Sequence, residues 1–86
     1  MERITELPKW FNGTIYDSGD TVTNPFSQET YKLNAIELSM YDFIMGANWF
    51  IEKAPNAATN KLVTDLRKGL NWFRKNNPEA YMVLLD

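Results

Sequence analysis

Two acidic side chains lie close together in the motif D-S-G-D, in which Asp17 and Asp20 flank a serine and a glycine. Neighbouring carboxylates can bind a divalent cation or exchange protons with a substrate. A calcium site, however, needs roughly six to eight oxygen ligands, and acidic residues in turns commonly bond to their own backbone. We therefore favour a structural role for this pair over a metal site or an acid–base site.

The chemistry open to the other residues is restricted because the sequence contains neither histidine nor cysteine. Nucleophilic catalysis usually pairs a serine, threonine or cysteine with a neighbouring base, and structural zinc sites use thiolates and imidazoles. The four glycines are dispersed, so the sequence has no glycine-rich phosphate loop. We expect no enzymatic activity, no cofactor and no metal.

A basic face is predicted on the helix expected at 59–76, with a tryptophan beside it. Cations next to an aromatic ring are typical of proteins that bind single-stranded nucleic acid through phosphate contacts and base stacking. A solvated face explains the same residues, because cations near a helix C-terminus are favoured by the helix dipole and the net charge is −2. The candidate nucleic-acid contacts are Arg67, Lys68, Trp72, Arg74 and Lys75.

The helix predicted at 34–53 has two apolar faces, although a surface helix needs only one. Its wider face fits the amphipathic helix 59–76. The narrower face, which is the candidate protein interface, consists of Leu38, Tyr41, Met45 and Trp49. Either the sheet covers this face within the chain, or a second copy or another protein covers it. Our main functional hypothesis is a non-enzymatic interaction module, either a homodimer or a binder of another protein, and the alternative is weak nucleic-acid binding.

Capping residues and apolar periodicity predict three helices, at 34–53, 59–76 and 78–85. Asn34 and Glu37 have the spacing of a capping box at the start of the first helix. That helix must end before Pro55, because the residue preceding a proline is pushed out of the helical region. Gly46 in its middle predicts that another backbone passes close by, since glycine costs about 1 kcal/mol there relative to alanine.

Turn residues divide the N-terminal part of the chain into short extended segments. We expect an irregular arm at 1–9 and strands at 10–16, 21–24 and 30–33. Gly19 and Pro25 mark the turns between these strands. The sequence therefore predicts a single α+β domain over 1–86, in which a three-stranded antiparallel β-meander at 10–33 precedes the helical part at 34–86. We expect the long central helix 34–53 to pack on the sheet, because three short strands are not stable alone.

The longest apolar runs are only a few residues long, whereas a helix that spans a bilayer needs roughly 20. The first residues carry acidic groups and do not form the apolar core of a signal peptide. We therefore expect a soluble, cytoplasmic protein without a membrane partner.

Three segments of the chain form recognisable motifs: N-P-F-S-x-E-x-Y-x-L at 24–33, E-L-S-M-Y-D-F-I-M-G-A at 37–47 and G-L-N-W-F-R-K-N-N-P-E-A-Y-M-V-L-L-D at 69–86. Together they resemble a small uncharacterised protein of marine tailed bacteriophages, the cyanophage-like group, over most of the chain after Trp10. Gln28 stands where such a turn is expected to carry glycine. The resemblance implies a phage accessory protein in the cytoplasm of a bacterial host, with a phage or host protein as partner and no functional residues to carry over.

Overall fold

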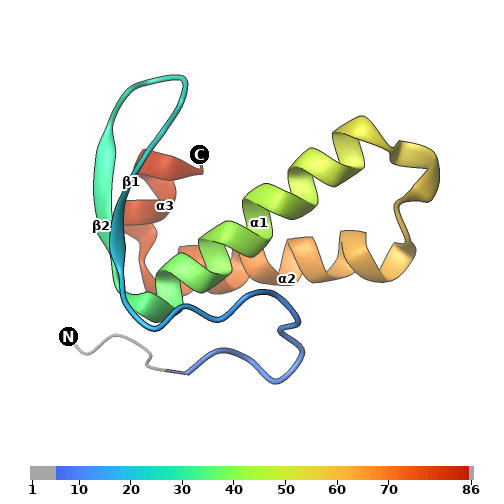
Figure 1. The fold of residues 1–86 in the computed structure, drawn as a ribbon, viewed down its shortest axis with the longest axis horizontal. Coiled ribbons are helices and arrows are strands. Elements are labelled where there is room, and N and C mark those ends of the chain that lie inside the picture. The colour runs from blue at the N-terminus through green and yellow to red at the C-terminus, as the bar shows by residue number, and fades with distance from the viewer. Residues whose placement is uncertain (1–5, 86) are drawn as a thin grey trace.

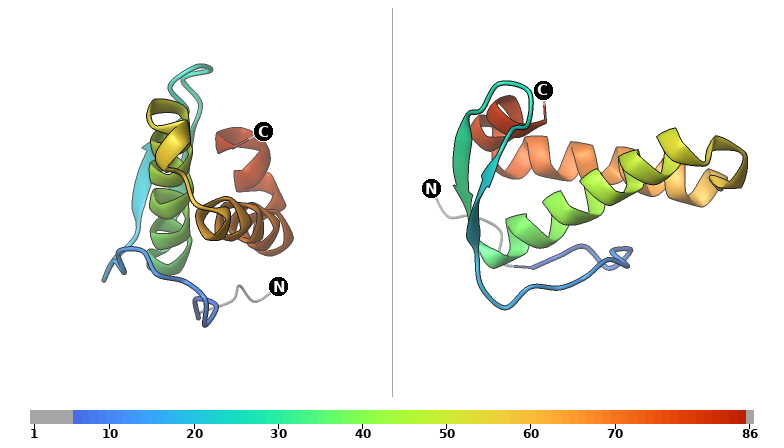
Figure 2. Two further views of the ribbon diagram at one scale, coloured as in Figure 1. Left: turned by 90° about the vertical axis from the view of Figure 1, so that its right-hand side faces the viewer. Right: turned by 45° about the horizontal axis from the view of Figure 1, so that its top comes forward.

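The computed structural model describes residues 6–85 and shows an α+β fold, in which a β-hairpin precedes three α-helices (Figure 1). The elements are β1 (Asp20–Thr23), β2 (Thr30–Leu33), α1 (Ala35–Lys53), a 3-10 turn (Pro55–Ala57), α2 (Asn60–Asn76) and α3 (Pro78–Leu84). α1 and α2 run in opposite directions, and α3 lies beside the hairpin near the start of α1 (Figures 1 and 2). The three predicted helices are therefore confirmed, with bounds that differ by one residue at most.

The described sheet has two antiparallel strands, in which Asp20 pairs with Leu33 and Thr23 pairs with Thr30. The prediction of a first strand at 10–16, and with it the three-stranded meander, is wrong. Trp10 and Phe11 both make edge contacts with the ring of Phe43 on α1, with centroid distances of 5.9 and 5.7 Å. Consecutive side chains of a strand point to opposite faces, so two neighbours that face one helix are incompatible with that conformation.

The segment before β1 instead follows an irregular path along the side of α1 that lies away from the hairpin loop (Figure 1). The backbone N–H of Tyr16 donates to Oγ of buried Ser39, at 2.9 Å, and so ties the segment to α1. Gly19 lies against the start of α1, where a Cβ atom would collide with the carbonyl oxygen of Leu33. The motif D-S-G-D is therefore not a hairpin turn. It is the place where the chain passes close to the backbone of Leu33 and Asn34. The predicted arm at 1–9 lies partly outside the described residues.

The start of α1 carries the predicted capping box. The backbone N–H of Glu37 donates to Oδ1 of Asn34 at 2.8 Å, and the backbone N–H of Asn34 donates to Oε1 of Glu37 at 2.9 Å. Two backbone N–H groups at the start of the helix are thus satisfied by side chains only three residues away, which explains why the sequence alone located this boundary. α1 then ends at Lys53, shortly before Pro55.

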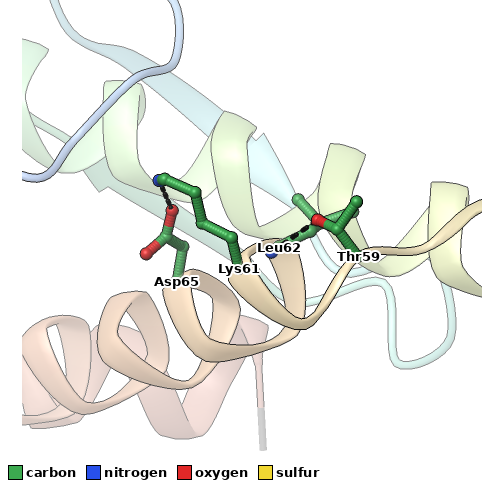
Figure 3. A network of polar contacts seen from close by, with 4 residues as sticks. All are labelled: Thr59, Lys61, Leu62 and Asp65. Carbon is green, nitrogen blue, oxygen red and sulfur yellow. Dashed lines mark hydrogen bonds and ion pairs between the residues drawn. The ribbon is translucent and has the colours of Figure 1, made fainter.

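α2 begins with a simpler cap (Figure 3). Oγ1 of Thr59 accepts from the backbone N–H of Leu62 at 3.1 Å. In the same first turn, Nζ of Lys61 lies 2.6 Å from Oδ2 of Asp65, which is four residues further along the helix and therefore on the same face. Both interactions favour the helix from its first turn.

The core lies mainly between α1 and α2, where Met40, Ile44 and Phe73 are fully buried. The close approach of the two helices occurs at Gly69 of α2, where an added Cβ would lie 3.2 Å from Sδ of Met40. The expectation that another backbone passes Gly46 is wrong for the described part of the chain, where no atom lies within 4 Å of the position of a Cβ there.

The hairpin packs mainly on α3, through its second strand β2, and β2 packs less extensively on α1. The predicted packing of helix 34–53 on the sheet is therefore shown only in part. A buried hydrogen bond of 2.7 Å, from Nδ2 of Asn77 to Oε2 of Glu37, joins the start of α3 to the start of α1. This polar contact fixes α3, and with it the hairpin, relative to the helix pair.

Candidate interaction surfaces

The structure divides the narrower apolar face of α1 into a covered half and an open half. Tyr41 is buried, with 9 % of its surface exposed, and Leu38 is half-buried. Burial raises the pKa of the Tyr41 hydroxyl above its usual value of 10.0. Met45 and Trp49, nearer the end of the helix, remain 36 % and 61 % exposed. Only this second half is accessible as a candidate interface.

Met45 and Trp49 form one wall of a groove of about 440 Å³, which we call the Phe26–Trp49 groove. The second wall is the hairpin loop, and the third is the end of α3. These three elements meet on the side of α1 that bears the hairpin loop (Figures 1 and 2). The residues that line the groove are Asn24, Pro25, Phe26, Met45, Asn48, Trp49, Glu52, Leu84 and Leu85.

Phe26 lies in the hairpin loop with 94 % of its surface exposed. The loop is nevertheless well ordered by hydrogen bonds, because Oδ1 of Asn24 accepts from the backbone N–H groups of Phe26 and Ser27 at 2.8 and 3.3 Å. Gln28 adopts a φ of 68°, the left-handed region that glycine usually occupies, and its backbone N–H donates to the carbonyl of Asn24 at 2.9 Å. The loop therefore presents an aromatic side chain to solvent on a fixed backbone.

Asn24 also anchors this loop to the last helix. Its Nδ2 donates to the carbonyl oxygen of Val83 at 2.9 Å, across 59 positions of sequence. The side chain thus uses its oxygen to shape the loop and its nitrogen to hold the loop against α3. Neither the anchoring role of Asn24 nor the exposure of Phe26 was predicted from the sequence, because neither has a local signal.

A second groove, of about 470 Å³, lies on the basic face of α2, and we call it the two-tryptophan groove. Of the predicted nucleic-acid contacts, Arg67 is exposed on α2 but does not line this groove. The lining residues are Trp10, Lys68, Asn71, Trp72, Arg74 and Lys75. The sequence did not single out Trp10, because it comes from a segment far from α2 along the chain.

One member of the acidic pair in D-S-G-D, Asp20, has a local structural role. Oδ1 of Asp20 accepts from the backbone N–H of Thr21 at 2.7 Å, and both Asp17 and Asp20 are exposed. Among residues 6–85, no group of three or more acidic side chains is placed to hold a metal ion. The hydrogen bond at the start of β1 is the kind of backbone contact expected for acidic residues near turns.

Comparison of the chain with protein-family models, with curated proteins and with solved structures gives no match. Over the described part of the chain, no helix combines the length and the apolar character needed to cross a membrane.

Proposed function

We propose that this protein is a small, non-enzymatic interaction module that pairs with a second copy of itself through the Phe26–Trp49 groove. The observation that carries the proposal is the juxtaposition of an almost fully exposed phenylalanine with a groove that contains a 61 % exposed tryptophan. Exposed aromatic side chains on a fixed backbone are typical of interface anchors.

The size of this surface fits a weak dimer. An aromatic side chain carries roughly 150–250 Å² of surface, so Phe26 and Trp49 together expose on the order of 300 Å². When Met45 and the polar rim are included, the area that two copies bury together approaches roughly 1,000 Å², the total at which specific interfaces begin. We therefore expect association with a micromolar or weaker dissociation constant.

The arrangement of the patch favours a second copy over an unrelated partner. In a two-fold symmetric pair the same surface of both chains meets, so each surface must contain both a protruding part and a hollow to receive it. Phe26 protrudes from the hairpin loop, and the hollow beside it is lined by Met45, Trp49 and Leu85. The net charge of −2 is small enough that two copies repel each other only weakly.

Sedimentation equilibrium over the micromolar to millimolar range tests this proposal. The weight-average mass of the natural chain should rise from 10.0 kDa toward twice that value. Phe26→Ser should remain monomeric, because it removes the protruding side chain from an exposed position and leaves the core intact. Circular dichroism should show unchanged helix content in the variant.

The matched control is Ile15→Ser, which removes another exposed apolar side chain from the segment on the other side of α1 (Figure 1). This variant should dimerise as the natural chain does. A natural chain that stays at 10.0 kDa up to millimolar concentration would refute the proposal. Equal loss of association in both variants would also refute it, because it would indicate nonspecific apolar contact.

A further inference from the structure

The two-tryptophan groove brings together aromatic and cationic side chains from two distant parts of the chain. Trp72 and three cations lie on α2, and Trp10 comes from the segment that precedes the hairpin. Both tryptophans are half-buried and line the groove. The groove shares no residue with the Phe26–Trp49 groove, so it is a separate candidate site.

Each tryptophan is supported from the side by another aromatic ring. The centroid of Trp10 lies 5.9 Å from that of Phe43, with the rings at 61°, and the centroid of Trp72 lies 6.2 Å from that of Phe73, at 65°. Edge-to-face contacts of this kind hold a ring in a defined orientation. The two indoles are thus fixed supports with part of their surface open to the groove.

The cations of the groove are available for a ligand. Among the described residues the only ion pair is Lys61–Asp65, so Lys68, Arg74 and Lys75 have no carboxylate partner there. Nη2 of Arg74 donates to Oδ1 of Asn71 at 3.1 Å, which holds the guanidinium beside the groove. None of the described residues that line the groove is acidic.

We infer that the two-tryptophan groove binds single-stranded nucleic acid. Aromatic faces and cations that line one groove suit a strand that offers flat bases together with phosphates, and every base can stack on an indole. A duplex keeps its bases stacked on each other, so it would offer the groove only phosphates. An acidic peptide offers charge but few flat rings, and the net charge of −2 opposes binding driven by charge alone.

Quenching of tryptophan fluorescence by oligothymidine of about ten nucleotides tests this inference, with oligouridine of the same length as the second probe. A Trp49→Phe background confines the emission to Trp10 and Trp72, since the chain has three tryptophans. Both probes should quench this emission, and the tighter one identifies the preferred strand, since the two differ in the sugar and in the methyl group of the base. With three phosphate contacts, the affinity should fall about 20-fold between about 50 and 200 mM salt.

Two arginine substitutions, each of which removes one positive charge, provide the matched comparison. Arg74→Gln removes a cation that lines the groove, whereas Arg67→Gln removes an exposed cation of the same helix outside it. The first should lower the logarithmic salt slope from about −2 to about −1.4, and the second should leave it unchanged. Trp72→Leu should weaken binding by roughly 5-fold or more, because it removes a stacking platform.

The inference is overturned if neither oligonucleotide quenches the emission at about 50 mM salt, where phosphate contacts are strong. It is also overturned if polyglutamate quenches equally well, because that result would show a response to charge without stacking. Equal effects of Arg74→Gln and Arg67→Gln would show a diffuse charge effect in place of a site. Thermal unfolding of each variant verifies that it is folded, and Trp10→Leu provides a second stacking test if Trp72→Leu fails to fold.

Discussion

Asn77 joins three elements through one buried side chain, which is 6 % exposed. Its Nδ2 donates to Glu37 at the start of α1, and its Oδ1 accepts from the backbone N–H of Ala80 at 3.2 Å in α3. The hydroxyl of Tyr31 on β2 lies 3.5 Å from the same oxygen. Hydrogen bonds are directional, so a buried polar residue in this position fixes how α1, α3 and β2 are oriented relative to one another, in addition to stabilising the fold.

Asn77→Ala should therefore destabilise the chain far more than an ordinary surface substitution. It removes the cap of α3 and takes the Nδ2 donor away from Glu37 in a buried place, for a combined cost of about 2–4 kcal/mol. The total stability of a chain of this size is on the order of 4–13 kcal/mol, so the urea midpoint should fall markedly. The control Asn60→Ala, at an exposed position, should change stability by less than about 0.5 kcal/mol. Equal midpoints for the two variants would contradict this prediction.

The hydroxyl of Tyr16 provides a prediction on pH. Its pKa is raised above 10.0 by loss of solvent and then by the negative charge of Asp42 and a hydrogen bond to it. A raised pKa means that the folded chain holds this proton more tightly than the unfolded chain does. The resulting contribution to stability is present below pH 10.0 and disappears as the pH rises through the folded-state pKa.

Asp42→Asn should lower the pKa of Tyr16, because it removes the neighbouring charge. Alkaline titration followed by tyrosinate absorbance should show one tyrosine that ionises earlier than in the natural chain. Asp17→Asn makes the same change of charge next to Tyr16 in sequence, but Asp17 does not contribute to the raised pKa. If the two variants give superimposable titration curves, the assignment to Asp42 is wrong.

At the scale of elements, the helices were predictable and the first strand was not. Helix boundaries depend on residues a few positions apart, and Asn34, Glu37 and Pro55 determine the ends of α1 locally. The conformation of 10–16 depends instead on Phe43, whose ring contacts two consecutive aromatic residues of that segment. Sequence composition favoured a strand, and contacts formed only in the folded chain decided otherwise.

The candidate surfaces also combine residues that the sequence could predict with residues that it could not. Met45 and Trp49 were identified from helical spacing, whereas the burial of Tyr41 depends on how the other elements pack on α1. Phe26 and Trp10 complete the two grooves from loops, and no periodicity connects them to their helices. Side chains on one helix face could therefore be grouped from sequence, while the opposite wall of each groove could not.

The two helical glycines differ in a way that allows a direct comparison. Gly46→Ala should stabilise α1 by about 0.5–1 kcal/mol, since alanine favours a helix and a Cβ has free space there. For a chain of this size that corresponds to a rise in Tm of a few degrees, roughly 2–8 °C. Gly69→Ala should gain less or lose stability, because its Cβ would crowd Met40 and Ile44. Thermal unfolding measures both, and a lower Tm for Gly46→Ala than for Gly69→Ala would contradict this account.

At the scale of the whole molecule, the chain presents two unlike surfaces. The Phe26–Trp49 groove is formed by the hairpin loop, α1 and α3, and Glu52 is among its lining residues. The two-tryptophan groove is formed by α2 and Trp10, and it contains three cations. Because the grooves share no lining residue, dimer formation and nucleic-acid binding are independent proposals. Loss of one activity in a variant should leave the other measurable.

The hydrogen bond between Asn24 and Val83 also bears on the order in which the chain acquires its surfaces. Closing a loop of 59 positions carries an entropic cost that short local contacts avoid, so this contact is expected to form after the helices and the hairpin. A partly folded chain whose α3 has not yet docked has no complete Phe26–Trp49 groove. In the proposed dimer, recognition through that groove would therefore require fully folded copies.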